Sequence, residues 1–435
     1  MKFFIKTKQF FFLSLVIVIQ QAMVAGSTYF LIKLTSSQHE QRGFLIQLFG
    51  FLSCLTLVYF PVSLQKYLQD KWVLSIQKKY LGLFRKNYQG RIDLLGNSVA
   101  QNEKFGFMQR ESFHVIDQVT FYWNDLLTTA LNVVFNIAVI GATLDKSFIG
   151  AYTGSFAIYG FFAYVFAKPL GMWSAATQAS RVAHSSILSK SWNTLLIGNQ
   201  MNIESLYKLE GDCFSELSSR VLKNRSKTES VQLLITLVTM VPVMGLLIYL
   251  IIQGLQNPVV LFPLIATLHR QVQIIQHIEV MGTLGLHYHS MSALLNGFFS
   301  SMQTPEKQTL DQRMKQEHLQ FIHSNGRTLV TGPNGAGKST WLKIKKQQLG
   351  DQAVYVPANM EIFFEQISDE MSTGQKAMAI LKHIEAENSK DRVFLFDEWD
   401  ANLDNINREI FSAVIQNIAK TNLVYEVRHN EYGLR

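Results

Sequence analysis

Runs without charged residues divide the first 300 residues of the chain. Five of these runs, each 19 residues or longer, contain no Asp, Glu, Lys or Arg. A helix needs about 20 mostly apolar residues to cross the hydrocarbon core of a bilayer. The longest run, 230–269, is interrupted by Gly254 to Pro258, which is typical of a tight turn, so we divide it into two spans. Core helices of a soluble protein would not leave five such runs in succession. The pattern therefore predicts six transmembrane helices, over about residues 9–32, 43–65, 118–144, 147–168, 230–253 and 258–280.

The first of these spans has a second interpretation. A basic start, Lys2 to Lys8, followed by an apolar run and the small residues Ala22 and Ala25, also resembles a secretory signal peptide. The charge-free run continues to Ile32, which is longer than the apolar region of a signal peptide needs to be. We therefore favour a retained first helix.

The two longest connections between spans are polar but have the periodicity of helices. Apolar residues recur at helical spacing from Leu64 to Tyr88, and Val182 to Val221 is similar. Both segments predict helices that continue beyond the membrane surface as stalks. We expect their turning points, Gly96 to Met108 and Ile197 to Glu210, to contact the second domain.

The sixth predicted span carries a polar stripe. His269, Gln273 and His277 are four residues apart and so share one face of a helix. Arg270 lies about 18 Å along a continuous helix from Pro258. Charged groups inside a span usually face a bundle interior or a watery cavity. We interpret these four polar residues as candidates for a solute pathway. The alternative is a span shifted outward, with the stripe at the inner interface.

After Ser300 the composition becomes polar, and short strands then alternate with helices. The predicted strands cover 328–331, 393–396 and 423–427, and the predicted helices 341–348 and 376–384. This alternation is typical of a parallel sheet covered by helices. We therefore divide the chain into a membrane domain over 1–303, a linker over 304–317 and an α/β domain over 318–435.

A glycine-rich loop follows the first predicted strand. Its residues, Gly332-Pro333-Asn334-Gly335-Ala336-Gly337-Lys338-Ser339-Thr340, fit the phosphate-binding pattern G-x-x-x-x-G-K-[ST] without a mismatch. The glycines let successive backbone N–H groups converge on an anion, and the dipole of the following helix favours negative charge. Lys338 adds a positive charge for the outer phosphates, and Ser339 adds a hydroxyl ligand for Mg²⁺. The loop therefore predicts binding of ATP with Mg²⁺.

A pair of acids follows the second predicted strand. Val393 to Phe396 is wholly apolar, as expected of a strand in the middle of a covered sheet, and it ends in Asp397 and Glu398. Asp397 at the strand tip would hold Mg²⁺ through water, and Glu398 would polarise the attacking water.

Composition and charge agree with a membrane protein. Hydrophobic residues make up 48% of the chain and charged residues only 17%, which excludes an ordinary soluble enzyme. The two cysteines, Cys54 and Cys213, lie too far apart in sequence to suggest a disulfide framework or a metal site.

The formal net charge is +8. The distribution of the basic residues explains this net charge without nucleic acid as a partner. Nine Lys and Arg lie in 66–125 and eight in 168–229, but the three loops on the opposite side of the membrane contain only three. The positive-inside rule places both termini in the cytoplasm.

Three further motifs resemble those of the ATP-binding cassette (ABC) transporters. Ser372-Thr373-Gly374-Gln375 is similar to their LSGGQ signature, with Thr373 in place of the first glycine. Asp397 to Asp404 is similar to their DEPTSALD run, with equal spacing. His429, after the strand 423–427, resembles their switch histidine. Six spans fused ahead of a cassette are similar to an exporter-type half-transporter.

The membrane half resembles two groups within that family, the SbmA/BacA-type bacterial transporters and the peroxisomal fatty-acyl half-transporters. The similar segments are Tyr67 to Trp72, Phe166 to Leu170, and Trp192 to Ile197 with the following Glu204. This resemblance implies that peptides, other bulky solutes or fatty-acyl thioesters are transported.

The family resemblance also implies roles for individual residues. Glu398 and His429 would be catalytic, and Ser339 and Asp397 would hold Mg²⁺. Besides the phosphate loop, Ser372, Gly374, Gln375 and Asp404 would contact ATP. In the family, the signature of a facing copy completes each ATP site. One cassette must therefore pair, most simply as a homodimer, or with a related half-transporter as a heterodimer.

The chain departs from the family pattern in two places. Only 34 residues separate Lys338 from Ser372, so the cassette is expected to be shortened. Ala358 stands where a glutamine is expected, with Asn359 beside it.

The sequence thus predicts a polytopic α-helical membrane domain of six helices followed by a shortened α/β P-loop ATPase. The expected function is ATP-driven transport of a peptide-like or other bulky solute across a bacterial inner (plasma) membrane, with the ATPase domain cytoplasmic. The alternative is an ATP-binding pseudo-transporter or regulatory scaffold with little hydrolysis.

Overall fold

The chain divides into two compact units. The first comprises Met1–Leu81 and Arg110–Ser300, and the second Gly82–Gln109 and Ser301–Arg435. The second unit thus includes a segment from between the second and third predicted spans, in addition to the domain expected from residue 318 onward. The computed structural model describes residues 2–36, 41–95, 108, 111–255, 258–303, 318–358, 371, 373–386, 391–401 and 403–428. The predicted linker, 304–317, lies outside the described residues.

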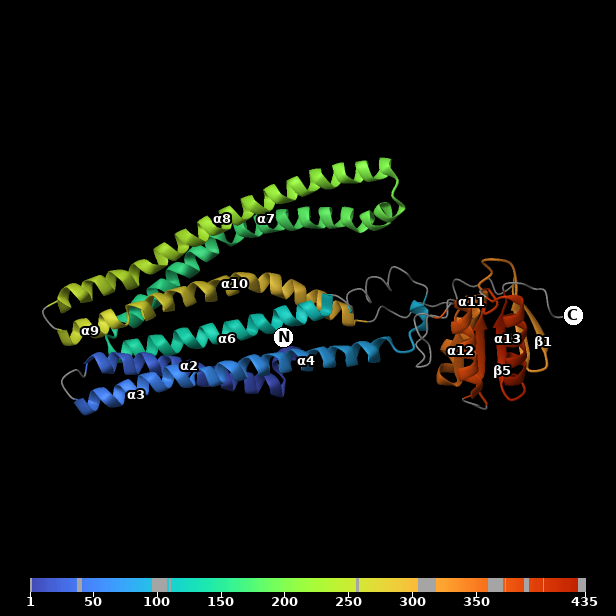
Figure 1. The fold of residues 1–435 in the computed structure, drawn as a ribbon, viewed down its shortest axis with the longest axis horizontal. Helices are drawn as coiled ribbons and strands as arrows, with labels where there is room; N and C mark the ends of the chain where they lie inside the picture. Colours follow the sequence, from blue (N-terminus) through green and yellow to red (C-terminus); the bar gives the residue numbers. More distant parts are fainter. Residues whose placement is uncertain are drawn as a thin grey trace. The chain divides into compact units, whose positions relative to one another are not determined.

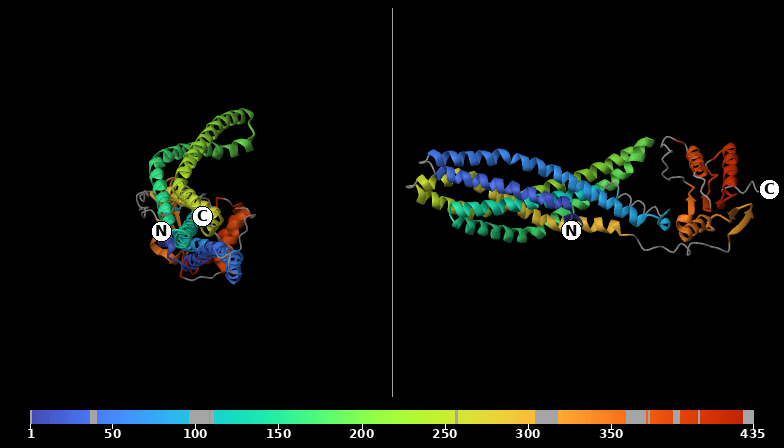
Figure 2. Two further views of the ribbon diagram at one scale, coloured as in Figure 1. Left: turned by 90° about the vertical axis from the view of Figure 1, so that its left-hand side faces the viewer. Right: turned by 90° about the horizontal axis from the view of Figure 1, so that it is seen from below.

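Long helices build the first unit, and they lie side by side along most of their length (Figures 1 and 2). The helix pair α7 and α8 leans away from the others toward the turn that joins it. The helices are α1 (Lys2–Ile5), α2 (Lys8–Ser36), α3 (Gln41–Leu57), α4 (Tyr59–Tyr88), α6 (Ser112–Thr143), α7 (Ser147–Ile197), α8 (Gln200–Gly254), α9 (Pro258–Ala266) and α10 (Leu268–Met302).

Five helical segments are long and apolar enough to cross a membrane, and they contain the first five predicted spans except for Leu144. They are Lys8–Ser36, Arg42–Tyr88, Ser112–Thr143, Ser147–Leu188 and Gln200–Gly254. Within the described residues, the sixth predicted span does not belong to this set. Its helix is interrupted at Thr267, which leaves α9 only nine residues long, and α10 begins with polar residues. The sixth span therefore stays a prediction.

The two predicted stalks are helical. Helix α4 continues without interruption to Tyr88, and α7 and α8 are 51 and 55 residues long. A short turn separates α7 from α8. Gly198, at φ 76°, caps α7 in the left-handed conformation, which glycine adopts without steric cost. The prediction of helices over 64–88 and 182–221 is confirmed, apart from this turn.

Polar side chains join α2 to α6 within the first unit. Thr28 donates a hydrogen bond to Asn136 Oδ1 at 2.9 Å, and Asn132 donates to Gln21 Oε1 at 2.8 Å. Neighbouring lipid is as apolar as the helix surfaces, so close packing and such hydrogen bonds hold membrane helices together. These contacts thus favour the observed pairing of α2 with α6.

The second unit contains a five-stranded sheet with strand order β1-β2-β5-β4-β3. Strand β1 pairs antiparallel with β2, and the other pairs are parallel. The prediction of strands at 328–331, 393–396 and 423–427 is confirmed. The elements are η1 (Ile92–Leu94), β1 (Gln320–Ser324), β2 (Arg327–Thr331), α11 (Lys338–Leu349), η5 (Gly350–Gln352), β3 (Ala353–Val356), α12 (Thr373–Ala386), β4 (Val393–Asp397), α13 (Asn405–Ile418) and β5 (Leu423–Val427).

Helices cover both faces of this sheet. Leu395 of β4 packs with Trp341 and Leu342 of α11 on one face. Phe394 and Phe396 of β4 pack with α12 and α13 on the other face. Side chains of a strand alternate between the two faces, so a strand buried on both sides must be apolar throughout. This arrangement places the carboxyl ends of β2, β5 and β4 next to one another at one edge.

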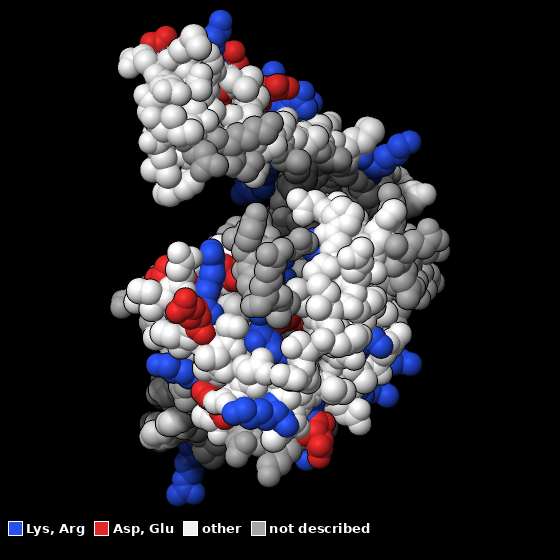
Figure 3. All heavy atoms as spheres, turned by 90° about the vertical axis from the view of Figure 1, so that its right-hand side faces the viewer, with Lys and Arg blue, Asp and Glu red and all other residues white. Residues whose placement is uncertain are grey.

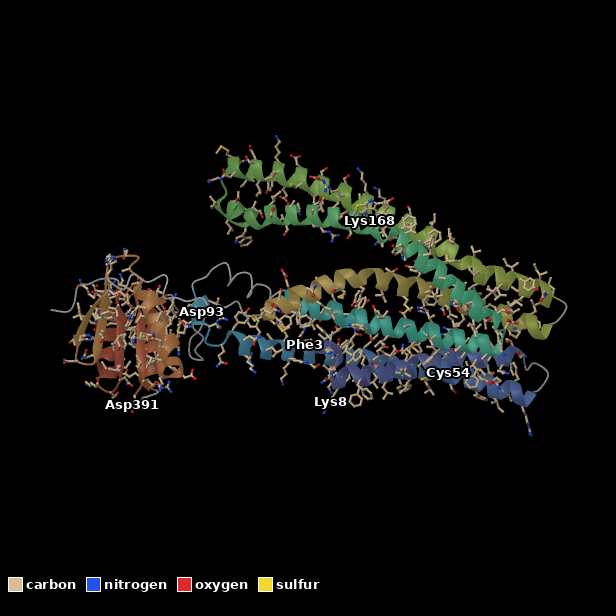
Figure 4. All side chains as sticks on the ribbon, turned by 180° about the vertical axis from the view of Figure 1, so that it is seen from behind. Phe3, Lys8, Cys54, Asp93, Lys168 and Asp391 are labelled. Atoms are coloured by element: carbon tan, nitrogen blue, oxygen red, sulfur yellow. The ribbon has the colours of Figure 1, made fainter. Side chains whose placement is uncertain are left out.

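Charged side chains of both signs are interspersed on the face of the molecule drawn in Figure 3. Figure 4 marks Cys54 on α3 and Asp391 just before β4. Both cysteines, Cys54 and Cys213, are free.

A close approach between α10 and α7 gives a first prediction. A Cβ at Gly282 would overlap the ring of Tyr159, which is 6% exposed. We expect Gly282→Ala to lower the free energy of unfolding by about 1–3 kcal/mol, because an overpacked core must move apart. Thermal unfolding of the purified protein in detergent measures this change. Gly285→Ala is the matched control, since a Cβ there meets nothing within 4 Å. Equal melting temperatures for the two variants would contradict the close packing.

Candidate functional site

The phosphate loop leaves β2 at the carboxyl edge of the sheet and leads into α11. Gly335 and Gly337 adopt φ values of 82° and 94°, a region that other residues rarely enter. A Cβ at Gly332 would lie 2.7 Å from the carbonyl oxygen of His318, so this glycine is needed for a close approach. Gly337 is the N-cap of α11. The first N–H groups of a helix have no acceptor within it, and here the loop leads directly into them.

Two polar side chains of α11 contact this loop and the end of β4. Lys338 Nζ donates a hydrogen bond to the Gly332 carbonyl oxygen at 2.7 Å. Ser339 Oγ donates to Asp397 Oδ1 at 2.9 Å. The two residues expected to hold Mg²⁺ are 58 positions apart in sequence, and the fold brings them into direct contact.

Asp397 has a second partner that the sequence did not reveal. The hydroxyl of Tyr355, from β3, donates to Asp397 Oδ2 at 2.8 Å. Burial, together with the negative charges of Asp397 and Glu398, raises the pKa of Tyr355, so the hydroxyl remains protonated and donates. Asp397, only 4% exposed, thus has both oxygens fixed. Hydroxyl and carboxylate oxygens are the hard ligands that Mg²⁺ prefers, so this donor set fits the ion.

Glu398, the predicted base, has an unusual backbone. Its φ is 44°, in the left-handed region, and its N–H donates to the carbonyl oxygen of Val427 at 2.9 Å. A non-glycine residue in this region carries strain that neighbouring contacts must support, and such residues cluster at functional sites. The hydrogen bond ties Glu398 to the end of β5. His429, the other predicted catalytic residue, follows that end and lies outside the described residues.

A buried carboxylate holds the same edge together from within the sheet. Glu426 of β5 is 1% exposed and accepts two hydrogen bonds from Arg327 Nη2, at 2.8 and 3.0 Å. Trp399 Nε1 donates to Glu426 Oε2 at 2.9 Å, and Arg428 contacts the same carboxylate at 3.2 Å. The ring of Trp399 stacks on Phe411, with centroids 4.6 Å apart. This Glu426 network fixes the loop after Glu398 against the end of β5.

The Glu426 network was not predicted from the sequence, although the sequence contains a signal of it. Glu426 is the only charged residue in the strand Leu423–Val427, and Trp399 stands where the similar motif has proline. An acid buried in a central strand is seldom tolerated without a partner.

The other expected ATP contacts lie elsewhere in the second unit. Gly374 and Gln375 are in the first turn of α12. Asp404 is the N-cap of α13, where its side chain accepts from the Asn407 N–H at 2.7 Å. Ser372 and Asn359 lie outside the described residues, while Ala358 follows β3 and is half-buried. The nucleotide contacts of Ser372, Gly374, Gln375 and Asp404 stay predictions.

The segment after α4 contacts α11 within the second unit. Lys343 Nζ of α11 donates to the Leu95 carbonyl oxygen at 2.9 Å, next to η1. Arg91 pairs with both oxygens of Asp93, at 2.7 and 2.8 Å, and Asp93 is 5% exposed. The expected contact range began at Gly96, and residues 96–107 lie outside the described residues. The contact with α11 therefore begins slightly earlier in the chain than expected.

In the first unit, three of the four predicted pathway residues lie together. Arg270 Nη1 donates to Gln273 Oε1 at 2.9 Å, and the ring nitrogen Nε2 of His269 lies 3.0 Å from Gln273 Nε2. Arg270 Nη2 donates to Ser27 Oγ of α2 at 3.3 Å. His277 follows on the same helix and is half-buried.

No protein-family model matches the sequence, and no curated protein does either. A solved structure, that of a bacterial Atm1-family ABC exporter with ATP bound, matches the fold with a TM-score of 0.61. The match covers 98% of this chain and 92% of the other, at 12% sequence identity. The chain has the fold of an ABC exporter. Long apolar helices followed by a P-loop α/β unit are the two parts of the ABC exporter fold that the sequence predicted. Resemblance to the SbmA/BacA-type and peroxisomal groups stays a prediction.

The Glu426 network gives a second prediction. We expect Glu426→Ala to lower the free energy of unfolding by about 3–5 kcal/mol, because Arg327 would remain buried without its counter-ion. Thermal unfolding followed by tryptophan fluorescence measures the change. Glu216→Ala is the matched control, because its pair with Arg220 lies on the surface and should alter the melting temperature little. Similar melting temperatures for both variants would show that the Glu426 network does not stabilise the fold.

Proposed function

We propose that the chain is an ATP-driven membrane transporter, a half-transporter that acts as a homodimer. The observation that carries this proposal is the contact of Ser339, at the end of the phosphate loop, with Asp397, with Glu398 held beside it. A phosphate loop, an oxygen pair suited to Mg²⁺ and an adjacent acid are the parts that phosphoryl transfer to water needs. The ABC exporter fold supports the coupling of these parts to a membrane domain.

In the proposed mechanism, the loop N–H groups and the start of α11 bind the phosphates of ATP. Lys338 exchanges the Gly332 carbonyl for an outer phosphate oxygen. Ser339 and Asp397 would hold Mg²⁺, which would supply positive charge to neutralise the phosphates. Glu398 takes the proton of the attacking water, with His429 as the second catalytic residue. Tyr355 keeps Asp397 oriented, and the Glu426 network keeps Glu398 in place.

Pairing with a second copy is supported by an exposed apolar surface at the joined ends of α7 and α8. Its residues Trp192, Leu196, Ile197 and Met201 are 68–78% exposed. These residues lie far along both helices from the apolar spans, so lipid would not cover them. Contiguous exposed apolar residues mark interaction sites. A second copy would cover this surface and supply Ser372, Gly374 and Gln375 to the facing ATP. A related half-transporter in a heterodimer is the alternative partner.

Transmission of motion is supported by the contact between η1 and α11. Lys343 lies on the same helix as Ser339, so a shift of α11 on nucleotide binding would reach Leu95 and the end of α4. Rigid helices that move as units are a common route for such coupling.

The pathway assigned to His269, Arg270, Gln273 and His277 is supported by the contact of Arg270 with Ser27. Ser27 lies six residues before Lys33 on α2, about 9 Å from the outer end of the first span. The guanidinium therefore lies nearer the outer end of the span than the 18 Å expected for the backbone position of Arg270. A position in the outer half of α2 argues against a stripe at the inner interface.

The proposed location is the bacterial inner (plasma) membrane, with the second unit in the cytoplasm. The five long apolar helices and the distribution of Lys and Arg support it. A regulatory scaffold that binds ATP with little hydrolysis is the second candidate function, favoured by Ala358 at the glutamine position.

A third prediction tests the catalytic assignment. We expect Glu398→Gln to retain ATP binding but lower turnover by a hundredfold or more, about 3 kcal/mol of barrier, because the base is lost. Phosphate release from protein in lipid vesicles measures turnover. Lys338→Ala is the contrasting variant, since it should lose ATP affinity. Unchanged turnover in Glu398→Gln would reject the assignment, and no phosphate release by the unaltered protein would favour the scaffold.

A fourth prediction tests the pairing. We expect the membrane complex of the Glu398→Gln variant, measured in the presence of ATP, to have the mass of two identical copies. Ile197→Glu with Met201→Glu should shift this complex toward single copies, because charge on the apolar surface opposes its burial. Ser219→Glu adds charge to an exposed position of the same α8 helix and serves as the control. A single copy in saturating ATP would contradict the homodimer, and two kinds of chain would indicate a heterodimer.

A further inference from the structure

Four polar residues of α2 and α10 form a cluster inside the first unit, which we term the Arg270 cluster: Ser27, His269, Arg270 and Gln273. The Arg270 guanidinium donates to Gln273 Oε1 at 2.9 Å and to Ser27 Oγ at 3.3 Å. Ser27 itself donates to the Val24 carbonyl oxygen, so its hydroxyl is oriented to accept from Arg270. The cluster thus has partners on two helices that are more than 240 positions apart in sequence.

The guanidinium lies beside the first predicted span and not at its outer end. Gln273 lies one turn further along α10, away from the α9–α10 junction, and Ser27 lies about 9 Å inside the position of Lys33. A guanidinium that only escaped the hydrocarbon would lie at the interface, level with Lys33. Arg270 is instead held at depth.

This charge has no counter-ion among the described residues. The two hydrogen-bond acceptors of Arg270, Gln273 and Ser27, are neutral, and no ion pair includes the guanidinium. The acid nearest along α10, Glu279, accepts a hydrogen bond from Gln232 of α8 at 2.7 Å. Removing a charge from water without compensation is costly, so an unpaired charge inside a span indicates a functional site.

The guanidinium also has unused donors. An arginine presents five N–H groups in a rigid fork, and the two hydrogen bonds to Gln273 and Ser27 use two of them. The neighbouring polar groups differ in this respect, since Thr28 is bonded to Asn136 and Gln21 to Asn132. Those amides and hydroxyls satisfy one another and join helices, whereas Arg270 keeps a positive charge and three donors that have no acceptor among the described residues.

We propose that the Arg270 cluster is an anion-binding site of the transport pathway and that the transported solute carries a carboxylate or a phosphate group. Both groups match the planar fork of a guanidinium with two parallel hydrogen bonds. Gln273 and Ser27 fix the orientation of this fork. The inference rests on the proposed transport function, and it specifies the chemistry of the solute at that site.

The test compares capped tetrapeptides that differ only in side chain: tetraglutamate, tetraphosphoserine and tetraglutamine. Binding to the purified full-length protein in lipid nanodiscs is measured by calorimetry without nucleotide, and stimulation of phosphate release is measured with ATP. We expect one of the two anionic peptides to bind and to stimulate, and the neutral peptide to do neither. The preferred anionic peptide identifies the group as carboxylate or phosphate.

Variants of the cluster decide whether Arg270 is responsible. Arg270→Gln should weaken binding of the preferred anionic peptide about tenfold or more, and Arg270→Lys should have an intermediate effect, because it keeps the charge but loses the fork. Lys33→Gln removes an exposed positive charge from the outer end of α2 and should leave binding unchanged.

Two results would overturn the inference: equal binding of the three peptides, or equal affinities of wild type and Arg270→Gln. The same results are expected if a carboxylate of the second copy already pairs with Arg270, so that case also counts against the inference. Failure of the proposed function is seen separately, as absence of phosphate release by the wild type. The binding measurement needs no nucleotide and decides the anion site in either case.

Discussion

The contact between Ser339 and Asp397 depends on the parallel pairing of three neighbouring strands. Strand β2 delivers the phosphate loop and α11, β4 delivers the acid, and β5 lies between them and pairs with both. A one-residue slip of β4 against β5 would turn Asp397 to the opposite face of the sheet. The register of the core therefore sets the geometry of the site.

The same edge is strained at Glu398 and stabilised just behind it. A left-handed backbone at a glutamate persists only where its surroundings hold it, and here the Val427 carbonyl and the Glu426 network do so. Glu426 compensates the charge of Arg327 and accepts from the indole of Trp399. The loop that carries the acid is thus fixed to a buried ion pair. This arrangement explains how Glu398 keeps a fixed backbone direction without a glycine.

Polar groups in the first unit must find their hydrogen-bond partners within the protein, because water is scarce between membrane helices. Asn132, Asn136, Gln21 and Thr28 are satisfied by one another, and they join α2 to α6. Arg270 is held by neutral groups and keeps its charge. Hydrogen bonds that only join helices need no net charge. The net charge of Arg270 therefore goes beyond what joining two helices requires.

The sequence by itself determined the two kinds of domain, five apolar helical segments, the phosphate loop and the strand ending in Asp397, because periodicity, charge gaps and a fixed glycine spacing are local properties. It did not reveal Tyr355 as a partner of Asp397, the Glu426 network or the contact of Arg270 with Ser27, since each joins residues from different elements. The interruption at Thr267 also escaped it, as the apolar run continues across that residue. Only the tertiary structure decided these features, because strand register and helix packing, not local pattern, determine which side chains meet.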